Sequence, residues 1–182
     1  FRSGKRACVI LPDTESSPRY ESQDRPQLEK ALTDAGFVAD IQNAGGDTAK
    51  YATIADQQMS KGCGVMVLDD LNGAGVQVAA KAAKAGIPVI AYDRPLEGAN
   101  YYVSFDNEYV GQLEGECIVD GLKAAGKDPA TASVVYVGGD PADGNAKMFY
   151  DGAVSAMSAA GIKPAQETPG TWDGAKAGTA FE

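Results

Sequence analysis

The sequence contains no histidine among its 182 residues. This absence excludes catalytic triads that use histidine as a base and metal sites with histidine ligands. Basic residues are also scarce, since 16 Lys and Arg face 25 Asp and Glu and leave a net charge of −9. A nucleic-acid-binding surface needs a positively charged face, so no nucleic-acid partner is expected. No apolar run approaches the roughly 18 residues of a transmembrane helix.

Glycine, by contrast, is plentiful at 22 residues, and it marks the ends of predicted helices. Gly36, Gly86 and Gly161 each follow an alanine at the end of a helical pattern and precede a short apolar segment. Glycine readily adopts the left-handed conformation that ends many helices. Strands that alternate with helices of this length predict parallel sheets with right-handed crossovers. The expected fold class is therefore α/β, with doubly wound parallel sheets.

The alternation changes after Arg94, because a strand over 101–105 follows without a long helix before it. We therefore expect a first α/β domain over residues 1–103 and a second over 104–182. The second domain has one strand-loop-helix unit over 133–160 and the start of another. A parallel sheet needs more strands than these to bury its core, so the second domain is expected to be incomplete.

The strand predicted over 88–92 ends in Tyr92, Asp93 and Arg94. Ligands of open α/β sheets bind beyond the carboxyl ends of the strands. A carboxylate acceptor beside a planar guanidinium donor suits a ligand with many hydroxyl groups. The alternative interpretation is an Asp-Arg pair that closes the strand end and binds nothing. These residues alone leave both interpretations open.

Further polar and aromatic residues follow other predicted strands. Arg19 and Tyr20 lie in the loop after the first strand, and Asn145 follows the strand over 133–137. Asn145 either bonds a ligand hydroxyl or caps the next helix, or does both. Asp13, Asp69 and Asp70 also follow strands, but a solvated loop position explains them at least as well. Asp106 is expected to cap the helix that follows it.

Four motifs in this order resemble one known family. They are SPRY at 17–20, YDR at 92–94, YVSFDN at 102–107 and DGNAKMF at 143–149. The chain resembles the type I periplasmic sugar-binding proteins of ABC transporters, most of all the xylose- and glucose/galactose-binding group. Two departures stand out: Tyr20 occupies a position where the family more often has tryptophan, and the chain ends at Glu182, before the strands that would return to both domains. We therefore expect a fragment or an incomplete chain.

The resemblance implies two α/β domains that are joined by a hinge and close on one monosaccharide. It implies an extracytoplasmic protein, periplasmic or lipid-anchored on the outer face of the cell membrane, that delivers the sugar to a membrane permease. A separate C-terminal fragment of the same protein is a further expected partner. No catalytic residue, metal or cofactor is expected. The expected ligand-binding residues are Arg19, Tyr20, Asp93, Arg94, Asn145 and Trp172.

Among these residues, Tyr20 and Trp172 are the candidates for stacking on the apolar face of a sugar ring. The alternative for Tyr20 is packing against the start of its own helix. The alternative for Trp172, the only tryptophan, is a core or boundary position.

Two of the three cysteines are candidates for a disulfide. Cys8 lies near the start of the first strand and Cys63 near the start of the third. In the doubly wound strand order 2-1-3-4-5 these strands are parallel neighbours about 4.8 Å apart, which is within disulfide reach. The alternative is two small buried thiols. Cys117 is expected to be a buried free thiol, because it lies on the apolar face predicted for the helix over 107–125. That face is formed by Val110, Leu113, Cys117, Ile118 and Leu122.

Two other functions remain open from the sequence. The effector-sensing domain of a sugar-responsive transcription repressor shares this fold, and a DNA-binding helix pair encoded upstream would identify it. An α/β enzyme is a weaker alternative, because the sequence has neither histidine nor a nucleophile elbow.

Overall fold

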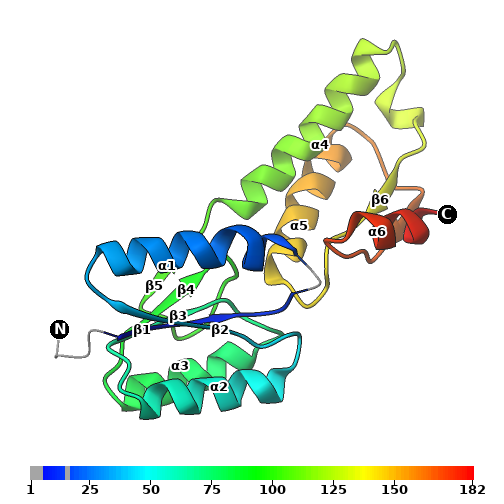
Figure 1. Ribbon diagram of the computed structural model, residues 1–182. Helices are drawn as coiled ribbons and strands as arrows, with labels where there is room; N and C mark the ends of the chain where they lie inside the picture. Colours follow the sequence, from blue (N-terminus) through cyan, green and yellow to red (C-terminus); the bar gives the residue numbers. More distant parts are fainter. Residues whose placement is uncertain (1–5, 15–16) are drawn as a thin grey trace. The chain divides into compact units, whose positions relative to one another are not determined.

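The computed structural model describes residues 6–14 and 17–182. The chain forms two compact units, Phe1–Ser104 and Phe105–Glu182. The first unit is a five-stranded sheet with helices on both faces, and the second contains a two-stranded sheet with its own helices (Figure 1).

All strand pairs of the first unit are parallel, in the order β2-β1-β3-β4-β5. This is the doubly wound order 2-1-3-4-5 expected from the sequence, with β5 at the edge next to β4. The strands are β1 (Arg6–Leu11), β2 (Val38–Asn43), β3 (Val65–Leu68), β4 (Val89–Tyr92) and β5 (Tyr101–Val103).

Helix α1 covers one face of this sheet, and α2 and α3 cover the other (Figure 1). The helical segments are η1 (Tyr20–Asp24), α1 (Arg25–Asp34), α2 (Thr48–Ser60) and α3 (Ala74–Lys84). The core under α2 and α3 includes Tyr51, Met66 and Val78, and the core under α1 includes Val9 and Leu11. The sheet is therefore buried on both faces, as its nearly continuous apolar strands require.

Local signals in the sequence set the helix boundaries. Asp47 caps α2, because its side chain accepts hydrogen bonds from the N–H groups of Ala49 and Lys50. Gly36 and Gly86 follow α1 and α3 with φ values of +83° and +69°, the left-handed conformation that glycine tolerates best.

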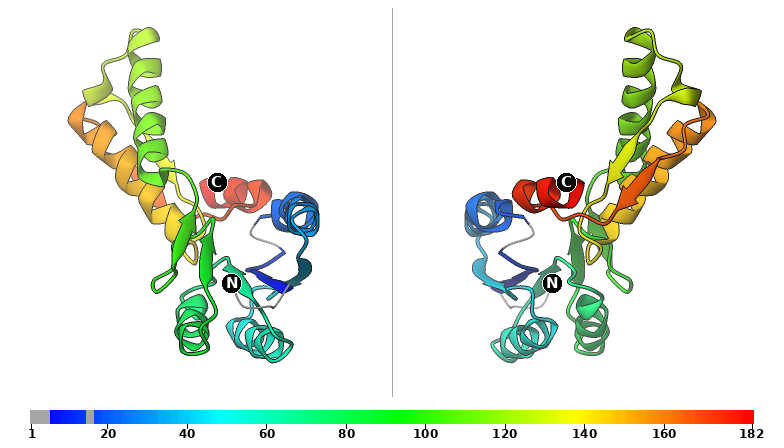
Figure 2. Two further views of the ribbon diagram at one scale, coloured as in Figure 1. Left: turned by 90° about the vertical axis from the view of Figure 1, so that its left-hand side faces the viewer. Right: turned by 90° about the vertical axis from the view of Figure 1, so that its right-hand side faces the viewer.

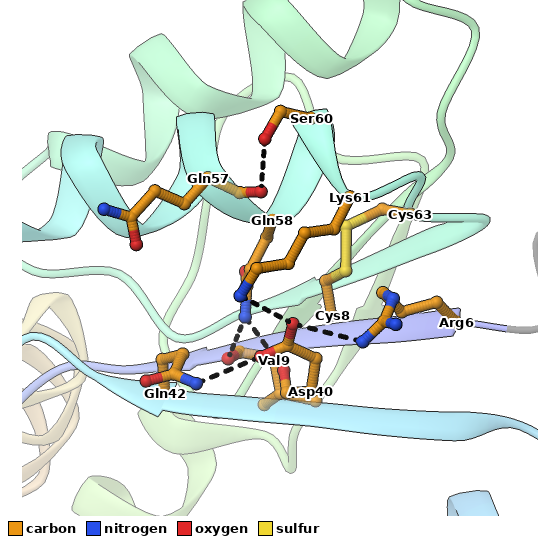
Figure 3. The surroundings of a disulfide bond; sticks show 10 residues. All are labelled: Arg6, Cys8, Val9, Asp40, Gln42, Gln57, Gln58, Ser60, Lys61 and Cys63. Carbon is orange, nitrogen blue, oxygen red and sulfur yellow. Dashed lines mark hydrogen bonds and ion pairs between the residues drawn. A yellow bond between two sulfur atoms is a disulfide. The ribbon is translucent and has the colours of Figure 1, made fainter.

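Cys8 and Cys63 are joined by a disulfide with 5.9 Å between their Cα atoms (Figure 3). The bond lies on the sheet face covered by α2, where the Gln58 side chain also links helix to sheet. Its Nε2 donates to the backbone oxygens of Val9 at 3.2 Å and Asp40 at 2.8 Å. A covalent bond and a buried amide thus hold α2 and its following loop against β1 and β2.

The second unit pairs only β6 and β7, again in parallel. Its elements are α4 (Asn107–Ala124), η2 (Pro129–Thr131), β6 (Val135–Val137), α5 (Gly144–Ala159), β7 (Gln166–Thr168) and α6 (Gly174–Phe181). Asp106 caps α4 as expected, since its carboxylate accepts from the N–H of Tyr109 at 3.0 Å. Helix α6 was not expected from the sequence. Across the described ranges, 6–14 and 17–182, no helix has the length and apolarity needed to cross a membrane.

Helices α4 and α5 lie side by side in direct contact (Figure 2). Glycines make this packing close: a Cβ on Gly111 would lie 2.1 Å from the backbone oxygen of Phe149, and one on Gly152 would lie 2.0 Å from that of Glu108. The face of α4 that packs therefore carries small residues rather than its larger apolar ones. Its buried residues are Asn107, Gly111, Gly115 and Val119.

The expected apolar face of α4 is therefore wrong in part. Leu113 and Ile118 are exposed, and Cys117 is an exposed free thiol rather than a buried one. Hydrophobic spacing alone favoured these residues, whereas close contact with α5 selects glycine.

Candidate functional site

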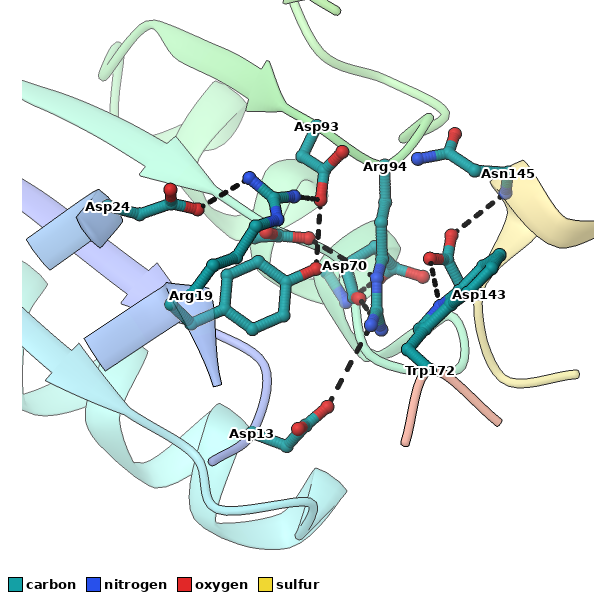
Figure 4. Close-up of polar contacts among 12 residues, drawn as sticks. Asp13, Arg19, Asp24, Asp70, Asp93, Arg94, Asp143, Asn145 and Trp172 are labelled. Carbon is teal, nitrogen blue, oxygen red and sulfur yellow. Dashed lines mark hydrogen bonds and ion pairs between the residues drawn. The ribbon is translucent and has the colours of Figure 1, made fainter. Parts of the chain in front are cut away.

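Acidic residues follow three adjacent strands of the first unit. Asp13 lies two residues beyond β1, Asp69 directly follows β3, and Asp93 directly follows β4. The carboxyl ends of parallel strands meet at one edge of a sheet, which is where ligands of α/β proteins bind. Figure 4 shows Asp13 and Asp93 at this edge, together with Arg19 and Arg94.

Arg94 is buried among these carboxylates, with 1% of its surface exposed. Its Nη1 donates to the backbone oxygen of Asp70 at 3.1 Å. Its Nη2 lies 3.8 Å from Oδ2 of Asp13, and its Nε lies 3.6 Å from Oδ1 of Asp69. Both carboxylates are themselves buried and have lost most of their contact with water. The positive charge of the guanidinium therefore stabilises their negative charges. Arg94 thereby links the ends of β1, β3 and β4.

Asp93 has a left-handed backbone conformation, with φ of +63°. Aspartate tolerates this region better than most residues with a side chain. Its N–H donates to the backbone oxygen of Val103 at 3.0 Å, and its own carbonyl accepts from the Tyr102 hydroxyl at 3.0 Å. The N–H of Arg94 donates to the carbonyl of Tyr92 at 2.8 Å and closes a tight turn. These bonds fix the backbone at the end of β4.

The Asp93 carboxylate accepts from two residues at the start of η1. The Tyr20 hydroxyl donates to Oδ2 at 2.8 Å, and Nη2 of Arg19 donates to the same oxygen. Nη1 of Arg19 donates to Oδ2 of Asp24 at 2.9 Å, so one guanidinium bridges two carboxylates (Figure 4). Burial acts to lower the pKa of Arg19, but the charges of Asp93 and Asp24 outweigh it and raise that pKa.

Tyr20 lies between the two arginines and is 1% exposed. The guanidinium carbons of Arg19 and Arg94 lie 4.8 Å and 5.7 Å from its ring centroid, within cation–π range. Burial raises the pKa of Tyr20, and the charge of Asp69 adds to this, so its hydroxyl stays protonated and donates at neutral pH. Stacking of this ring on a sugar stays a prediction, since the guanidinium groups pack against the ring in the structure.

The strand-end network therefore combines four carboxylates with two guanidinium groups. A carboxylate offers about four acceptor sites, and a guanidinium offers five donors in a fixed fork. The excess of acceptors suits a neutral ligand that is rich in hydroxyl donors. In the part of the chain that the structure describes, no group of three or more acidic or cysteine side chains is arranged to hold a metal ion. The residues of the network are Asp13, Asp24, Asp69, Asp93, Arg19 and Arg94.

In the second unit, Asp143 connects Asn145 and Trp172. Its Oδ1 accepts from the N–H of Asn145 at 2.8 Å and caps α5, and its Oδ2 accepts from Nε1 of Trp172 at 3.0 Å. Asn145 lies in the first turn of α5 and is 3% exposed. The alternative that Asn145 itself caps the helix is therefore wrong, because Asp143 occupies the cap.

Trp172 is half-buried within the second unit. Its ring meets Phe149 edge-on, with 6.0 Å between the centroids. It also packs on Gly139, where a Cβ would lie 2.1 Å from a ring atom of Trp172. The ring is thus held by a hydrogen bond, an aromatic contact and a glycine. Its role in binding a ligand stays a prediction.

Sequence reasoning undervalued three members of the network. Asp13 and Asp69 were explained at least as well as solvated loop residues, yet 7% and 1% of their surfaces are exposed. Asp24 was not singled out at all. The positions of Asp13 and Asp69 just after strands could have indicated that they belong to the network. No such signal marks Asp24, because only the shape of η1 brings it to Arg19.

The chain matches the family described as periplasmic binding protein domain over residues 8–182. It is 36% identical over 162 residues to the multiple sugar-binding periplasmic receptor ChvE of Rhizobium radiobacter. The aligned region covers 86% of this chain and 45% of ChvE. It is 31% identical to the D-xylose-binding periplasmic protein of Escherichia coli, over 74% of this chain and 40% of the relative. The chain thus spans less than half the length of these relatives.

Solved structures of ABC transporter solute-binding proteins are also similar to this chain. An ABC transporter solute-binding protein from Clostridium phytofermentans, with bound β-D-glucose, has a TM-score of 0.73 and 31% identity, over 94% of this chain and 53% of that protein. One from Mycobacterium smegmatis, with bound glycerol, has a TM-score of 0.83 and 26% identity, over 97% and 60%. The chain therefore belongs to the periplasmic binding protein domain family, and its α/β units have the type I fold of that family.

Proposed function

We propose that the protein is an extracytoplasmic solute-binding protein that captures a monosaccharide and delivers it to an ABC transporter permease. The observation that carries the proposal is the network of four carboxylates and two arginines at the strand ends of the first unit. In this proposal Arg19, Asp93 and Arg94 bind hydroxyls by donating to and accepting from them, and no residue of the network performs a chemical step. The ligand class we propose is xylose, glucose or galactose.

The same proposal assigns Arg19, Tyr20, Asp93 and Arg94 to ligand binding in the first unit, and Asn145 and Trp172 in the second. The similarity to receptors named for sugars supports this ligand class and a periplasmic location. A lipid anchor on the outer face of the cell membrane is the variant of this location that we propose for a cell without a periplasm. The repressor alternative gains no support from these relatives, which are named as periplasmic receptors.

Thermal-shift screening against monosaccharides tests this function. A sugar present at 100 times its dissociation constant stabilises the folded state by about 2.7 kcal/mol. For a chain of this size that corresponds to a rise of roughly 5–10 °C in the melting temperature. D-xylose, D-glucose and D-galactose should be compared with mannitol, an acyclic polyol without a sugar ring. The absence of a shift with every monosaccharide at millimolar concentration would contradict the proposal.

A further inference from the structure

The chain enters α1 through a π-helical turn, η1, which is wider than an α-helical turn. The N–H of Arg25 bonds to the carbonyl of Tyr20, five residues earlier. In an α-helix, residues five apart point about 140° away from each other, which would separate Arg19 from Asp24. The wider turn brings the two side chains together at 2.9 Å. Turns of this type are rare and occur frequently at functional sites.

Asp24 is a costly residue at this place. It is 8% exposed, and burial raises the pKa of its carboxyl, with the charge of Asp93 adding to the effect. Arg19 and a hydrogen bond from Tyr92 act in the opposite direction. A neutral side chain of the same shape would avoid the cost of burying a charge. Burial of the charge therefore opposes fold stability, and the carboxylate is retained together with its bond to Arg19.

Arg19 gains a fixed orientation from this carboxylate. Its side chain is 43% exposed, and an arginine side chain loses much rotamer entropy when it is immobilised. With Asp93 as its single anchor, the guanidinium could rotate about that contact. With Asp24 bonded to Nη1 and Asp93 to Nη2, both ends of the fork are held.

We propose that Asp24 is a positioning residue that locks the Arg19 guanidinium, so that Arg19 and Asp93 present one fixed pattern of donors and acceptors to the sugar. This inference rests on the proposed function. It adds a residue outside the strand ends whose effect on the ligand passes entirely through Arg19.

The test is a double-mutant cycle measured by calorimetry with the best-binding sugar. Asp24→Asn removes the charge and keeps the size, and should weaken binding about tenfold, because a charge-assisted bond is replaced by a neutral one. In an Arg19→Ala background, Asp24→Asn should cause no further loss of affinity. The melting temperature without sugar should stay the same or rise in Asp24→Asn. Asp34→Asn is the matched control, since Asp34 pairs with Lys30 on the exposed side of α1.

The outcomes distinguish failure of the positioning role of Asp24 from failure of the proposed sugar-binding function. If the parent binds sugar and Asp24→Asn binds as tightly, the positioning role is overturned while the proposed function stands. Equal losses from Asp24→Asn with and without Arg19 would also overturn it, because Asp24 would then act independently of Arg19. If the parent binds no monosaccharide, the proposed function fails and the positioning role fails with it.

Discussion

Cys8 on β1 is bonded to Cys63, which lies two residues before β3 and 55 residues later in the sequence. The bond closes a loop that contains β2 and α2. It therefore joins β1 covalently to the segment that leads into β3.

Reduction of this disulfide should destabilise the protein. Chain-entropy arguments for a loop of this length give about 4 kcal/mol. Urea unfolding with and without reductant should show a lower midpoint in reductant, and Cys8→Ser/Cys63→Ser should reproduce the lower value. Cys117→Ser is the control, because that exposed thiol has no bond to lose. Coincident unfolding curves with and without reductant would contradict the prediction.

Arg94→Ala should destabilise the first unit as well as weaken sugar binding. Removal of the guanidinium leaves the carboxylates of Asp13 and Asp69 buried without their positive partner, a change that typically costs about 3–5 kcal/mol. Chemical denaturation without ligand measures this cost. Lys81→Ala removes an ion pair with Asp56 whose two side chains are about half exposed, and should cost less than about 1 kcal/mol. Equal stabilities of the two variants would show that Arg94 does not compensate the buried charges.

Gly111→Ala and Gly121→Ala should have opposite effects on stability. Both glycines lie on α4, but a Cβ on Gly111 would clash with the Phe149 backbone, whereas nothing lies within 4 Å of one on Gly121. The first change should cost about 1–3 kcal/mol through overpacking. The second should gain up to about 1 kcal/mol from helix propensity. Thermal unfolding followed by circular dichroism distinguishes them, and similar melting temperatures would refute close packing of α4 on α5.

Glu21 should make stability depend on pH on the acid side. Hydrogen bonds from Arg25, at 2.5 Å and 3.0 Å, and from Asn43, at 2.7 Å, lower the pKa of its carboxyl against the effect of burial. A lowered folded-state pKa gives stability that is present above the unfolded value of about 4.3 and is lost as the pH falls through the folded value. Glu21→Gln should therefore flatten the stability profile below about pH 4.3. Glu29→Gln, on helix α1, is the control. If Glu21→Gln and Glu29→Gln have the same stability profile below about pH 4.3, the prediction is wrong.

Much of the first unit followed from the sequence because its signals are local. Apolar segments such as Val65–Leu68 gave the strands, and the glycines after α1 and α3 gave the helix ends. The strand order then placed Cys8 beside Cys63. It also brought Asp93 and Arg94 to the edge of the sheet where the carboxyl ends of the strands meet. Each of these steps needs only a short stretch of sequence and the regular geometry of a parallel sheet.

The features that sequence reasoning missed depend on contacts between distant segments. The buried face of α4 is set by the backbone of α5, so the larger residues Leu113 and Ile118 gave the wrong face. Burial of Asp69 depends on Arg94, which lies 25 residues later in the sequence. The π turn has no composition signal of its own, and it alone brings Asp24 to Arg19.

Trp172 is the only tryptophan, so fluorescence excited selectively in tryptophan reports on this one position. Its Nε1 donates to Oδ2 of Asp143 at 3.0 Å. Asp143→Ser should keep the cap of α5, since serine caps helices about as well as aspartate. The shorter serine cannot reach Nε1, so the ring should become more solvated and its emission maximum should move to longer wavelength.

The matched control for this change is Asp128→Ser. Asp128 caps η2 by accepting from the N–H of Ala130 at 3.0 Å. This substitution alters a cap of the same kind while leaving the Asp143 bond intact, and it should leave the emission unchanged. Circular dichroism on both variants should show the helix content of the parent. If Asp143→Ser has the parent's emission spectrum, or if both variants shift equally, then Asp143 does not hold the indole, and Gly139 and Phe149 alone fix its place in the second unit.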